Sequence, residues 1–278
     1  MELWFSELHS ETAKLTMKIK EHLCSVKSEY QKLDILDTYD YGRILVLDGV
    51  LMITEKDEFI YHEMVTHLPM AVNPKIEKVL VIGAGDGGTV SQLVKYKTIK
   101  EITMIEIDKV VVEKCIEYFP HLTRGFKDER VTIKFEDGLK AVRQIKDYYD
   151  LIIVDSTDPF GPGEGLFAKE FYGNCYNALN ENGILINQHE SPFYEQYKDM
   201  VTKMHQRISS FFDICQVYQA HIPTYPSGHW LFGFASKKFK GDVVDSAWKD
   251  FKIECKYYNE ELHKGSFALP NYVKELIK

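Results

Sequence analysis

The chain has 278 residues, of which 45% are hydrophobic and 27% charged; this composition predicts a packed globular protein and excludes disorder. The 34 basic and 42 acidic residues give a formal net charge of −8, which argues against nucleic-acid binding and leaves cationic ligands open. No apolar run is long enough to span a membrane, and no secretory signal is evident. Five scattered cysteines without metal-binding spacing predict reduced thiols, a cytoplasmic location and no metal site.

The first 55 or so residues predict a small antiparallel β meander. Apolar and polar residues alternate within residues 13–24 and 32–37, which is the period of a half-buried strand. Asp48-Gly49 lies between two apolar runs and is a strong hairpin signal. We expect strands at residues 13–24, 32–37, 43–47 and 50–54. A helix over residues 57–68, capped by Asp57 and ending before Pro69, is expected next.

From residue 78 the pattern changes to short apolar runs that alternate with helical segments. The expected strands span residues 79–82, 102–107, 131–135, 151–154 and 184–187, and the expected helices span 88–96, 109–118, 168–179 and 193–209. This order predicts a parallel, Rossmann-like α/β sheet with helices on both faces. Two more β runs, at 212–220 and 229–236, predict a hairpin at the sheet edge. We expect two domains, an N-terminal β domain over residues 1–56 and a Rossmann-like domain over residues 57–278.

Each of the first four strands of this sheet ends in an acidic residue or leads into one. These residues are Asp86, Glu106, Asp108, Asp137, Asp155 and Asp158. The carboxyl ends of parallel strands form one edge, where open α/β sheets bind their ligands. Each acid alone could simply cap the next helix, but several acids on one edge raise one another's pKa values and cost stability. The pattern therefore predicts a site for a cationic ligand.

A glycine loop lies directly between the first of these strands and the helix after it. Gly83, Gly85 and Gly88 match the G-x-G-x-x-G spacing, and Glu106 follows 21 residues beyond Gly85, where a ribose-binding acid is expected. The loop therefore predicts a nucleoside-containing ligand. Asp86 would place a negative charge beside the pyrophosphate of a dinucleotide. S-adenosyl compounds have a sulfonium and no phosphate, so the loop favours them over NAD.

The charge of Asp86 also distinguishes between S-adenosyl compounds. S-adenosylmethionine carries a carboxylate on its amino-acid end, whereas the decarboxylated form carries only the amine. Two unit charges 4 Å apart interact by about 4 kcal/mol at an effective dielectric of 20, and half of that is more than tenfold in binding. Asp86 would repel the carboxylate and attract the amine. The sequence therefore indicates decarboxylated S-adenosylmethionine and transfer of its aminopropyl group.

Eight segments, in order over residues 4–236, together resemble the spermidine synthase (polyamine aminopropyltransferase) family. They are Tyr30-Gln31, YGRILVLDGV (41–50), DEFIYHEM (57–64), GAGDGG (83–88), MIEID (104–108), EDG (136–138), DSTDPFGP (155–162) and PTYPSG (223–228). The resemblance implies a methyltransferase-type Rossmann-like sheet preceded by a small antiparallel β domain. It also implies that the aminopropyl group of decarboxylated S-adenosylmethionine passes to putrescine, giving spermidine and methylthioadenosine.

The resemblance assigns roles to residues at three parts of the expected site. The adenosyl end is expected to contact Gln31, Gly83, Gly85, Glu106, Asp137, Gly138 and Pro162. The amines of the two substrates are expected to contact His62, Asp86, Asp155, Ser156, Thr157, Asp158 and Gln188. Proton transfer at the reacting amine is expected to involve Asp155, Tyr61 and Tyr225. His62 departs from the family pattern, since some members carry Gln at that position.

The implied reaction is a direct displacement that needs neither a metal nor a tightly bound cofactor. The amine attacks the carbon beside the sulfonium, and methylthioadenosine leaves. Putrescine is the expected acceptor, although cadaverine, agmatine and spermidine stay open. Strand edges in the N-terminal domain favour a homo-oligomer, either a dimer or a tetramer.

Three other functions stay open from the sequence alone. The first is an N-methyltransferase that uses intact S-adenosylmethionine on a diamine. The second is an NAD-dependent dehydrogenase, although no group of residues suited to hydride transfer is evident. The third is a polyamine-binding protein without catalytic activity.

Overall fold

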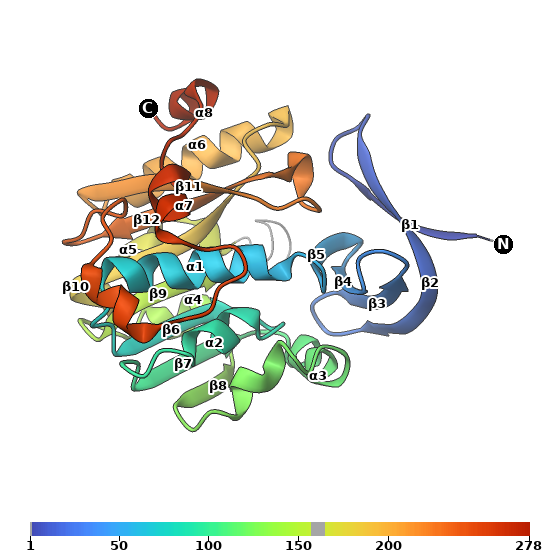
Figure 1. Ribbon diagram of the computed structural model, residues 1–278, viewed down its shortest axis with the longest axis horizontal. Helices are drawn as coiled ribbons and strands as arrows, with labels where there is room; N and C mark the ends of the chain where they lie inside the picture. The colour runs from blue at the N-terminus through green and yellow to red at the C-terminus, as the bar shows by residue number, and fades with distance from the viewer. Residues whose placement is uncertain (1, 157–164) are drawn as a thin grey trace.

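Two β-sheets, one from the first 54 residues and one from the rest of the chain, face each other across the site described below (Figure 1). The structure is a computed structural model that describes residues 2–156 and 165–278. Among these residues no helix combines the length and apolar character that crossing a membrane requires.

The N-terminal sheet is an antiparallel meander with the strand order β1-β2-β3-β4-β5. Its strands are β1 (Leu3–Leu8), β2 (Lys14–Lys27), β3 (Lys32–Thr38), β4 (Arg43–Leu47) and β5 (Val50–Thr54). The predicted meander is confirmed, but strand β1 was not predicted. Its large apolar side chains Leu3, Trp4 and Leu8 are exposed, while Glu7 is buried. The strand therefore lacks the inward apolar alternation by which a strand is recognised.

The second sheet contains β6 (Lys78–Gly83), β7 (Glu101–Glu106), β8 (Val131–Phe135), β9 (Tyr149–Asp155), β10 (Leu179–Glu190), β11 (Ile214–His221) and β12 (His229–Ser236). Its order is β11-β12-β10-β9-β6-β7-β8. Strands β6 to β10 are parallel to their neighbours within that group, and β11 and β12 form the predicted antiparallel hairpin at the edge. The chain passes from β6 outward to β7 and later returns to β9 on the other side of β6. This is the topological switch point at which such sheets bind ligands.

Helices cover both faces of this sheet, as predicted (Figure 1). They are α1 (Glu58–Val72), α2 (Gly88–Leu93), α3 (Lys109–Tyr118), α4 (Gly138–Val142), α5 (Lys169–Ala178), α6 (Glu195–Ser209), α7 (Glu260–Ser266) and α8 (Asn271–Leu276), with 3₁₀ turns η1 (Thr123–Lys127), η3 (Pro226–Gly228) and η4 (Ser246–Phe251). Val79 and Val81 of β6 pack in the core under α1 and α2, and Leu80 and Ile82 pack in the core under α4, α5 and α6. Burial on both faces explains why this strand reads as a continuous apolar run.

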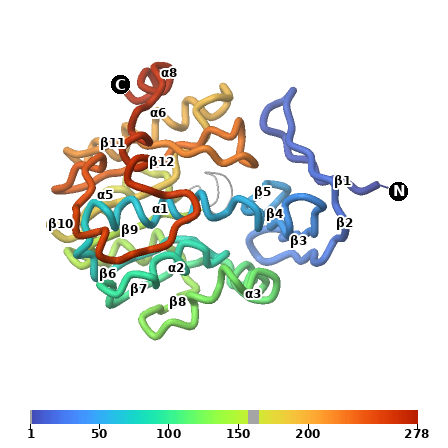
Figure 2. Tube along the Cα trace, viewed as in Figure 1, coloured from blue at the N-terminus to red at the C-terminus, as the bar shows by residue number. Residues whose placement is uncertain are grey.

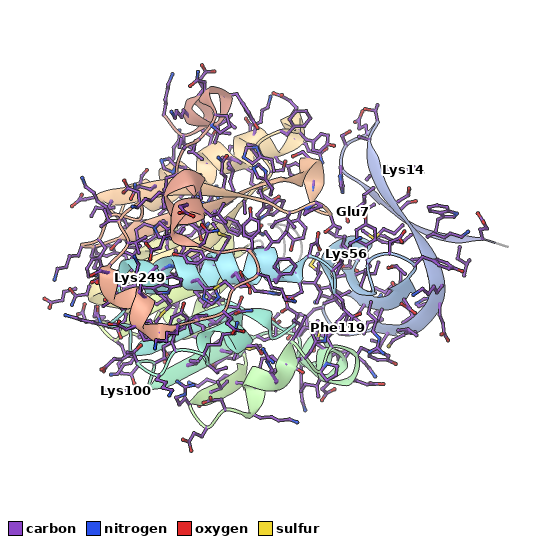
Figure 3. All side chains as sticks on the ribbon, viewed as in Figure 1. Glu7, Lys14, Lys56, Lys100, Phe119 and Lys249 are labelled. Atoms are coloured by element: carbon purple, nitrogen blue, oxygen red, sulfur yellow. The ribbon has the colours of Figure 1, made fainter. Side chains whose placement is uncertain are left out.

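Helix α3 joins the two sheets into one packed body. Its buried Val111 and Cys115, with the following Phe119, share a core with Leu33 and Ile35 of strand β3. Figure 3 shows Phe119 at this junction. Arg43 of β4 adds a polar contact, because its guanidinium donates to the Tyr118 carbonyl at 2.6 Å. The site between the sheets is therefore held on packed elements rather than on a free linker.

Two expectations about helix α1 are wrong. Asp57 is at the N-cap position but its side chain does not cap the helix; its carboxylate instead accepts hydrogen bonds from the hydroxyls of Thr54 at 2.6 Å and Thr224 at 2.7 Å. The helix also continues through Pro69 to Val72. Every residue from Ile60 to Val72 is buried, and this packing outweighs the hydrogen bond that the proline ring removes.

The segment after residue 237 is more ordered than its weak sequence pattern suggests. Its turn η4 packs beside α1, its helix α7 packs against β11, and its last helix, α8, packs against α6 (Figure 2). Glu63, buried on α1, anchors it by accepting hydrogen bonds from the backbone N–H groups of Lys256, Tyr257 and Tyr258 at 2.8–2.9 Å. A carboxylate with three such donors is a structural anchor, which sequence pattern alone does not reveal.

Candidate active site

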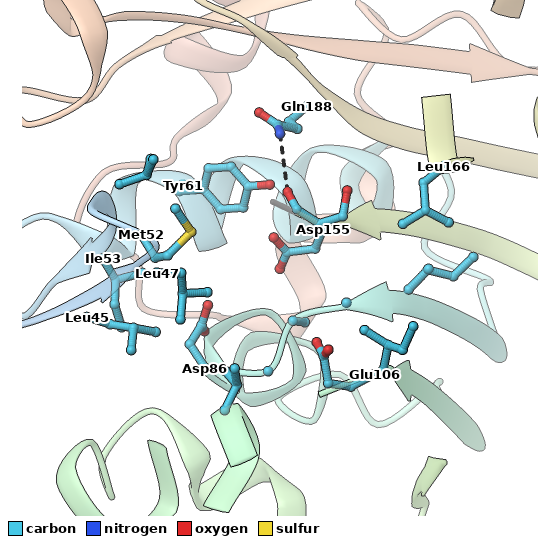
Figure 4. A pocket seen from close by; sticks show the side chains of 18 of the residues that line it. Leu45, Leu47, Met52, Ile53, Tyr61, Asp86, Glu106, Asp155, Leu166 and Gln188 are labelled. Atoms are coloured by element: carbon cyan, nitrogen blue, oxygen red, sulfur yellow. Dashed lines mark hydrogen bonds between the residues drawn. The ribbon is translucent and has the colours of Figure 1, made fainter. Parts of the chain in front are cut away.

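A pocket lies at the carboxyl ends of β6, β7 and β9, where the N-terminal sheet meets the larger sheet (Figure 4). The predicted site residues that line it are Gln31, Tyr61, His62, Gly83, Gly85, Asp86, Glu106, Asp137, Gly138, Asp155, Ser156, Gln188 and Tyr225. Thr157, Asp158 and Pro162 lie outside the described residues. The side chains of Asp86, Glu106 and Asp155 point into one space in Figure 4. The structure therefore brings these three predicted acids together.

The glycine loop follows β6 in tight contact with the end of β9. Gly83 has φ +91°, and a Cβ there would collide with the Asp155 carbonyl, so only glycine is tolerated. The next residue, Ala84, has φ +63° and donates its N–H to that same carbonyl at 2.8 Å. Strained non-glycine backbone of this kind persists only where the surroundings enforce it. The loop thus fixes Asp86 relative to Asp155.

Asp155 ends strand β9 half-buried, with neutral hydrogen-bond donors around its carboxylate. Thr89 donates its hydroxyl to Oδ2 at 2.6 Å, and Tyr61 also hydrogen-bonds the carboxylate. Burial, followed by the negative charge of Asp86, raises the pKa of Asp155 to about 6. Burial and the charge of Asp155 hold the pKa of Tyr61 well above its ordinary value, so Tyr61 keeps its proton and acts as a donor.

His62, near the N-terminal end of α1, lies between the carboxylates of Glu58 and Asp86. Its Nδ1 is 2.6 Å from Glu58 Oε2, and its Nε2 is 3.2 Å from Asp86 Oδ1. Burial opposes a charge on this ring, but the charges of Asp86 and Glu58 outweigh it and raise the pKa of His62 well above its ordinary value. The imidazolium in turn overcomes the effect of burial on Asp86 and lowers the pKa of that carboxyl. Asp86 is therefore an ionised carboxylate near neutral pH.

Glu106 ends β7 beside the glycine loop, where a carboxylate can accept hydrogen bonds from a ribose diol. Its Oε1 accepts the N–H of Asp108 at 2.8 Å, and a Cβ on Gly85 would lie 3.1 Å from its Oε2. Burial, and then the charges of Asp108 and Asp155, raise the pKa of Glu106 to about 7. A hydroxyl-bearing ligand would relieve this unfavourable burial by donating to the carboxylate.

Two predicted adenosyl contacts are held by helix N-termini. Asp137 accepts the N–H of Leu139 at 2.9 Å and so caps α4. Gln31 donates its amide N–H at 3.0 Å to Asp108, which caps α3. Asp137 thus both caps a helix and lines the pocket, and its contact with an adenosyl group stays a prediction.

Tyr225 and Gln188 also line the pocket. The Tyr225 hydroxyl donates to the Met52 carbonyl at 2.8 Å, which ties the 223–228 turn to strand β5. Its predicted part in proton transfer would therefore use the oxygen lone pairs rather than the hydroxyl proton. Gln188 donates to the Ser156 carbonyl at 3.2 Å, the bond that is dashed in Figure 4. Both roles stay predictions.

Sequence reasoning missed Glu7 and Trp230, which also line the pocket. Glu7 is 8% exposed and accepts the N–H of Leu51 at 2.8 Å; Figure 3 shows it on the inner side of the N-terminal sheet. A carboxylate at this position extends the acidic lining to the side opposite the strand ends. A Glu at an inward position of an alternating strand is a recognisable signal, but only once β1 is known to be a strand.

Comparison with known proteins gives consistent matches over the chain. A family model described as "Spermidine synthase tetramerisation domain" matches residues 3–55, and one described as "Spermine/spermidine synthase domain" matches residues 58–245. The polyamine aminopropyltransferases of Alkaliphilus oremlandii and Clostridium perfringens (strain ATCC 13124) are 59% and 58% identical, over 100% of this chain and 99% of theirs.

Two solved structures agree with the whole fold. A spermidine synthase in complex with the transition-state analogue AdoDATO superposes with a TM-score of 0.95 at 42% identity. The spermidine synthase from Thermotoga maritima gives a TM-score of 0.94 at 41% identity. Each match covers 99% of this chain and 94% of the other.

The raised pKa of Asp155 predicts a stability change with a defined sign. The folded pKa of about 6 is above the ordinary value of 3.8, so ionisation of Asp155 destabilises the ligand-free fold above pH 6, and this cost disappears below about pH 4. Asp155→Asn should therefore raise the free energy of unfolding at pH 8 by up to about 3 kcal/mol, with little effect at pH 4. Urea unfolding at both pH values measures the difference.

Asp199→Asn is the control for this experiment, because the Asp199 side chain is 90% exposed. It should change the free energy of unfolding little at either pH. An effect of Asp155→Asn that is the same at both pH values would show that the ionised carboxylate of Asp155 does not destabilise the fold.

Proposed function

The chain belongs to the spermine/spermidine synthase family, and from this premise we propose that it transfers the aminopropyl group of decarboxylated S-adenosylmethionine to putrescine. The observation that carries the proposal is the cluster of half-buried carboxylates, Asp86, Asp155 and Glu106, around one pocket. Among the described residues that line this pocket, none is a lysine or arginine. A ligand with two positive charges balances such a site. The products are spermidine and methylthioadenosine.

The proposal favours the decarboxylated donor over S-adenosylmethionine. Asp86 is ionised and His62 compensates part of its charge, but Glu58, His62 and Asp86 together still carry one net negative charge. A ligand carboxylate near Asp86 would meet this charge and that of Asp155. The same argument and the family matches make an N-methyltransferase or an NAD-dependent dehydrogenase the less favoured function.

The proposed reaction is one in-line displacement. A neutral nitrogen of the diamine attacks the methylene carbon beside the sulfonium, the carbon–sulfur bond breaks, and its electron pair neutralises the sulfur. A free alkylamine has a pKa of about 10.4, so making it neutral at pH 7 costs roughly 4–5 kcal/mol. Asp155 accepts the proton that the attacking nitrogen loses, and its raised pKa narrows this gap. Tyr61 and Thr89 hold the carboxylate in place, which supplies orientation.

The direct test incubates the protein with decarboxylated S-adenosylmethionine and, separately, putrescine, cadaverine, agmatine and spermidine. Mass spectrometry should detect spermidine and methylthioadenosine with putrescine as the best acceptor. Asp155→Asn should lower turnover at least 100-fold, because it removes the proton acceptor, while methylthioadenosine binds within threefold of the parent. Asp199→Asn is again the control. Methylated putrescine, binding without product, or near-normal turnover of Asp155→Asn would contradict the proposal.

Asp86→Asn tests the charge argument separately from catalysis. The ratio of the dissociation constants for S-adenosylmethionine and its decarboxylated form should fall at least tenfold, because the amide no longer repels the carboxylate or attracts the amine. Calorimetry with both ligands measures this ratio. If the variant keeps the parent ratio, Asp86 does not set the donor preference.

We also propose that the protein is a homo-oligomer assembled through the N-terminal sheet, whose matching family model is described as a tetramerisation domain. Strand β1 is the outer strand of this sheet, and its Leu3, Trp4 and Leu8 are 51%, 55% and 67% exposed. Clustered exposed apolar side chains on an edge strand are a typical contact surface.

The free cysteines suit the reducing conditions of the cytoplasm, and the cytoplasmic location stays a prediction.

Light scattering should give a mass above that of one chain, and the double variant Trp4→Glu with Leu8→Glu should lower it, because charges disrupt an apolar contact. Phe193→Glu is the matched control, since Phe193 is 60% exposed but belongs to the other part of the chain. A monomeric parent, or a double variant with the parent mass, would contradict this interface.

A further inference from the structure

We propose that Glu58 is a positioning residue that keeps both nitrogens of the His62 ring protonated, so that His62 holds Asp86 oriented toward the amine of the aminopropyl donor. The role of Asp86 in donor binding rests on the proposed function, whereas the contacts among Glu58, His62 and Asp86 do not depend on it. Glu58 is in the first turn of α1, four residues before His62. Its side chain is 9% exposed and that of His62 is 1% exposed.

The contacts of the His62 ring require two N–H groups. Nδ1 faces Glu58 Oε2 at 2.6 Å and Nε2 faces Asp86 Oδ1 at 3.2 Å. A carboxylate accepts hydrogen bonds and does not donate when ionised. A neutral imidazole carries one N–H, so one of its lone pairs would point at a carboxylate oxygen. The arrangement therefore selects the imidazolium, with Glu58 as the partner on the side away from the pocket.

The packing around the ring leaves it little freedom to leave this position. A Cβ on Gly88 would collide with the His62 ring, so the glycine loop closes directly over it. The ring also stacks edge-on against Tyr61, with centroids 5.7 Å apart. Because rotation is blocked, the protonation state of His62 decides whether Asp86 meets a donor or a lone pair.

Other charged groups reach this chain of contacts from the neighbouring elements. Asp155, at the end of β9, interacts electrostatically with His62 and with Asp86. Lys95, just after α2, interacts with Glu58. Asp155 faces the pocket, whereas Glu58 lies behind His62. Glu58 is thus the group that can stabilise the imidazolium without competing for the substrate.

The two carboxylate oxygens of Asp86 have different partners. Oδ1 accepts both the His62 ring N–H and the backbone N–H of Gly88, the latter at 2.7 Å. The proposal assigns the second oxygen, Oδ2, to the donor amine. Without the imidazolium, Asp86 loses one of these two fixed donors and becomes easier to protonate, because its lowered pKa depends on His62. Donor binding should then weaken as the pH falls.

The first test reads the ring itself and needs no turnover. Nitrogen-detected NMR of the folded protein at pH 7 should show both His62 nitrogens protonated in the parent and only one in Glu58→Gln. Glu58→Asp keeps the charge and should retain part of the doubly protonated population. Glu113→Gln, which breaks the exposed Lys109–Glu113 pair of the same i,i+4 spacing, should change nothing. Doubly protonated His62 in Glu58→Gln would overturn the proposal.

The second test is a double-mutant cycle on the donor KM. Glu58→Gln should raise the donor KM about tenfold at pH 6 and less at pH 7, with kcat at saturating donor within threefold of the parent. In a His62→Gln background the glutamine amide does not change its protonation between pH 6 and 7. Adding Glu58→Gln should therefore change the donor KM less than twofold at either pH. Equal effects of Glu58→Gln in both backgrounds would show that Glu58 does not act through His62.

The two tests separate this inference from the proposed function. If no aminopropyl product forms with any amine, the proposed function fails while the NMR result still decides the state of His62. If product forms but the ring of His62 is unchanged in Glu58→Gln, only the positioning role of Glu58 fails. Circular dichroism of each variant confirms that the fold is retained before either result is interpreted.

Discussion

The repulsion among half-buried carboxylates at one sheet edge is the constraint on which this site depends. Asp86, Glu106 and Asp155 end in one pocket, and the fold gives each a different compensation. Asp86 has the His62 imidazolium, Asp155 has two neutral donors, and Glu106 has backbone N–H groups. The result is one acid with a lowered pKa and two with raised ones, so the three similar residues differ in charge and in chemical use.

Much of the site could be predicted because its residues follow apolar runs whose meaning is local. The segment Val79 to Ile82 is buried on both faces, so its four consecutive apolar residues identify it as a strand. The glycines that follow this strand place Asp86 at the carboxyl edge of the sheet. The parallel order then brings Asp155 beside Gly83, although 72 residues separate them. The strand order alone therefore predicts that these acids lie close together, and no side-chain contact has to be known.

The parts that could not be predicted depend on contacts between distant segments. The local sequence predicts that Asp57 caps the helix, but its carboxylate accepts a hydrogen bond from the Thr224 hydroxyl instead. A contact over this distance in sequence has no local signal. Pro69 looked like a helix end, but burial overrides it. The order of the segment after residue 237 has no local signal, because its anchor, Glu63, lies almost 200 residues earlier. In each case tertiary packing outweighed a sound local preference.

The two sheets need each other for the pocket to exist. Strands β4 and β5 supply apolar lining residues, Glu7 supplies a carboxylate, and the Tyr225–Met52 and Thr224–Asp57 bonds clamp the 223–228 turn onto that side. The N-terminal sheet therefore forms one wall of the candidate site. Anything that fixes this sheet, including the proposed interface through β1, would also fix that wall, so the proposed assembly and the proposed substrate site share one element.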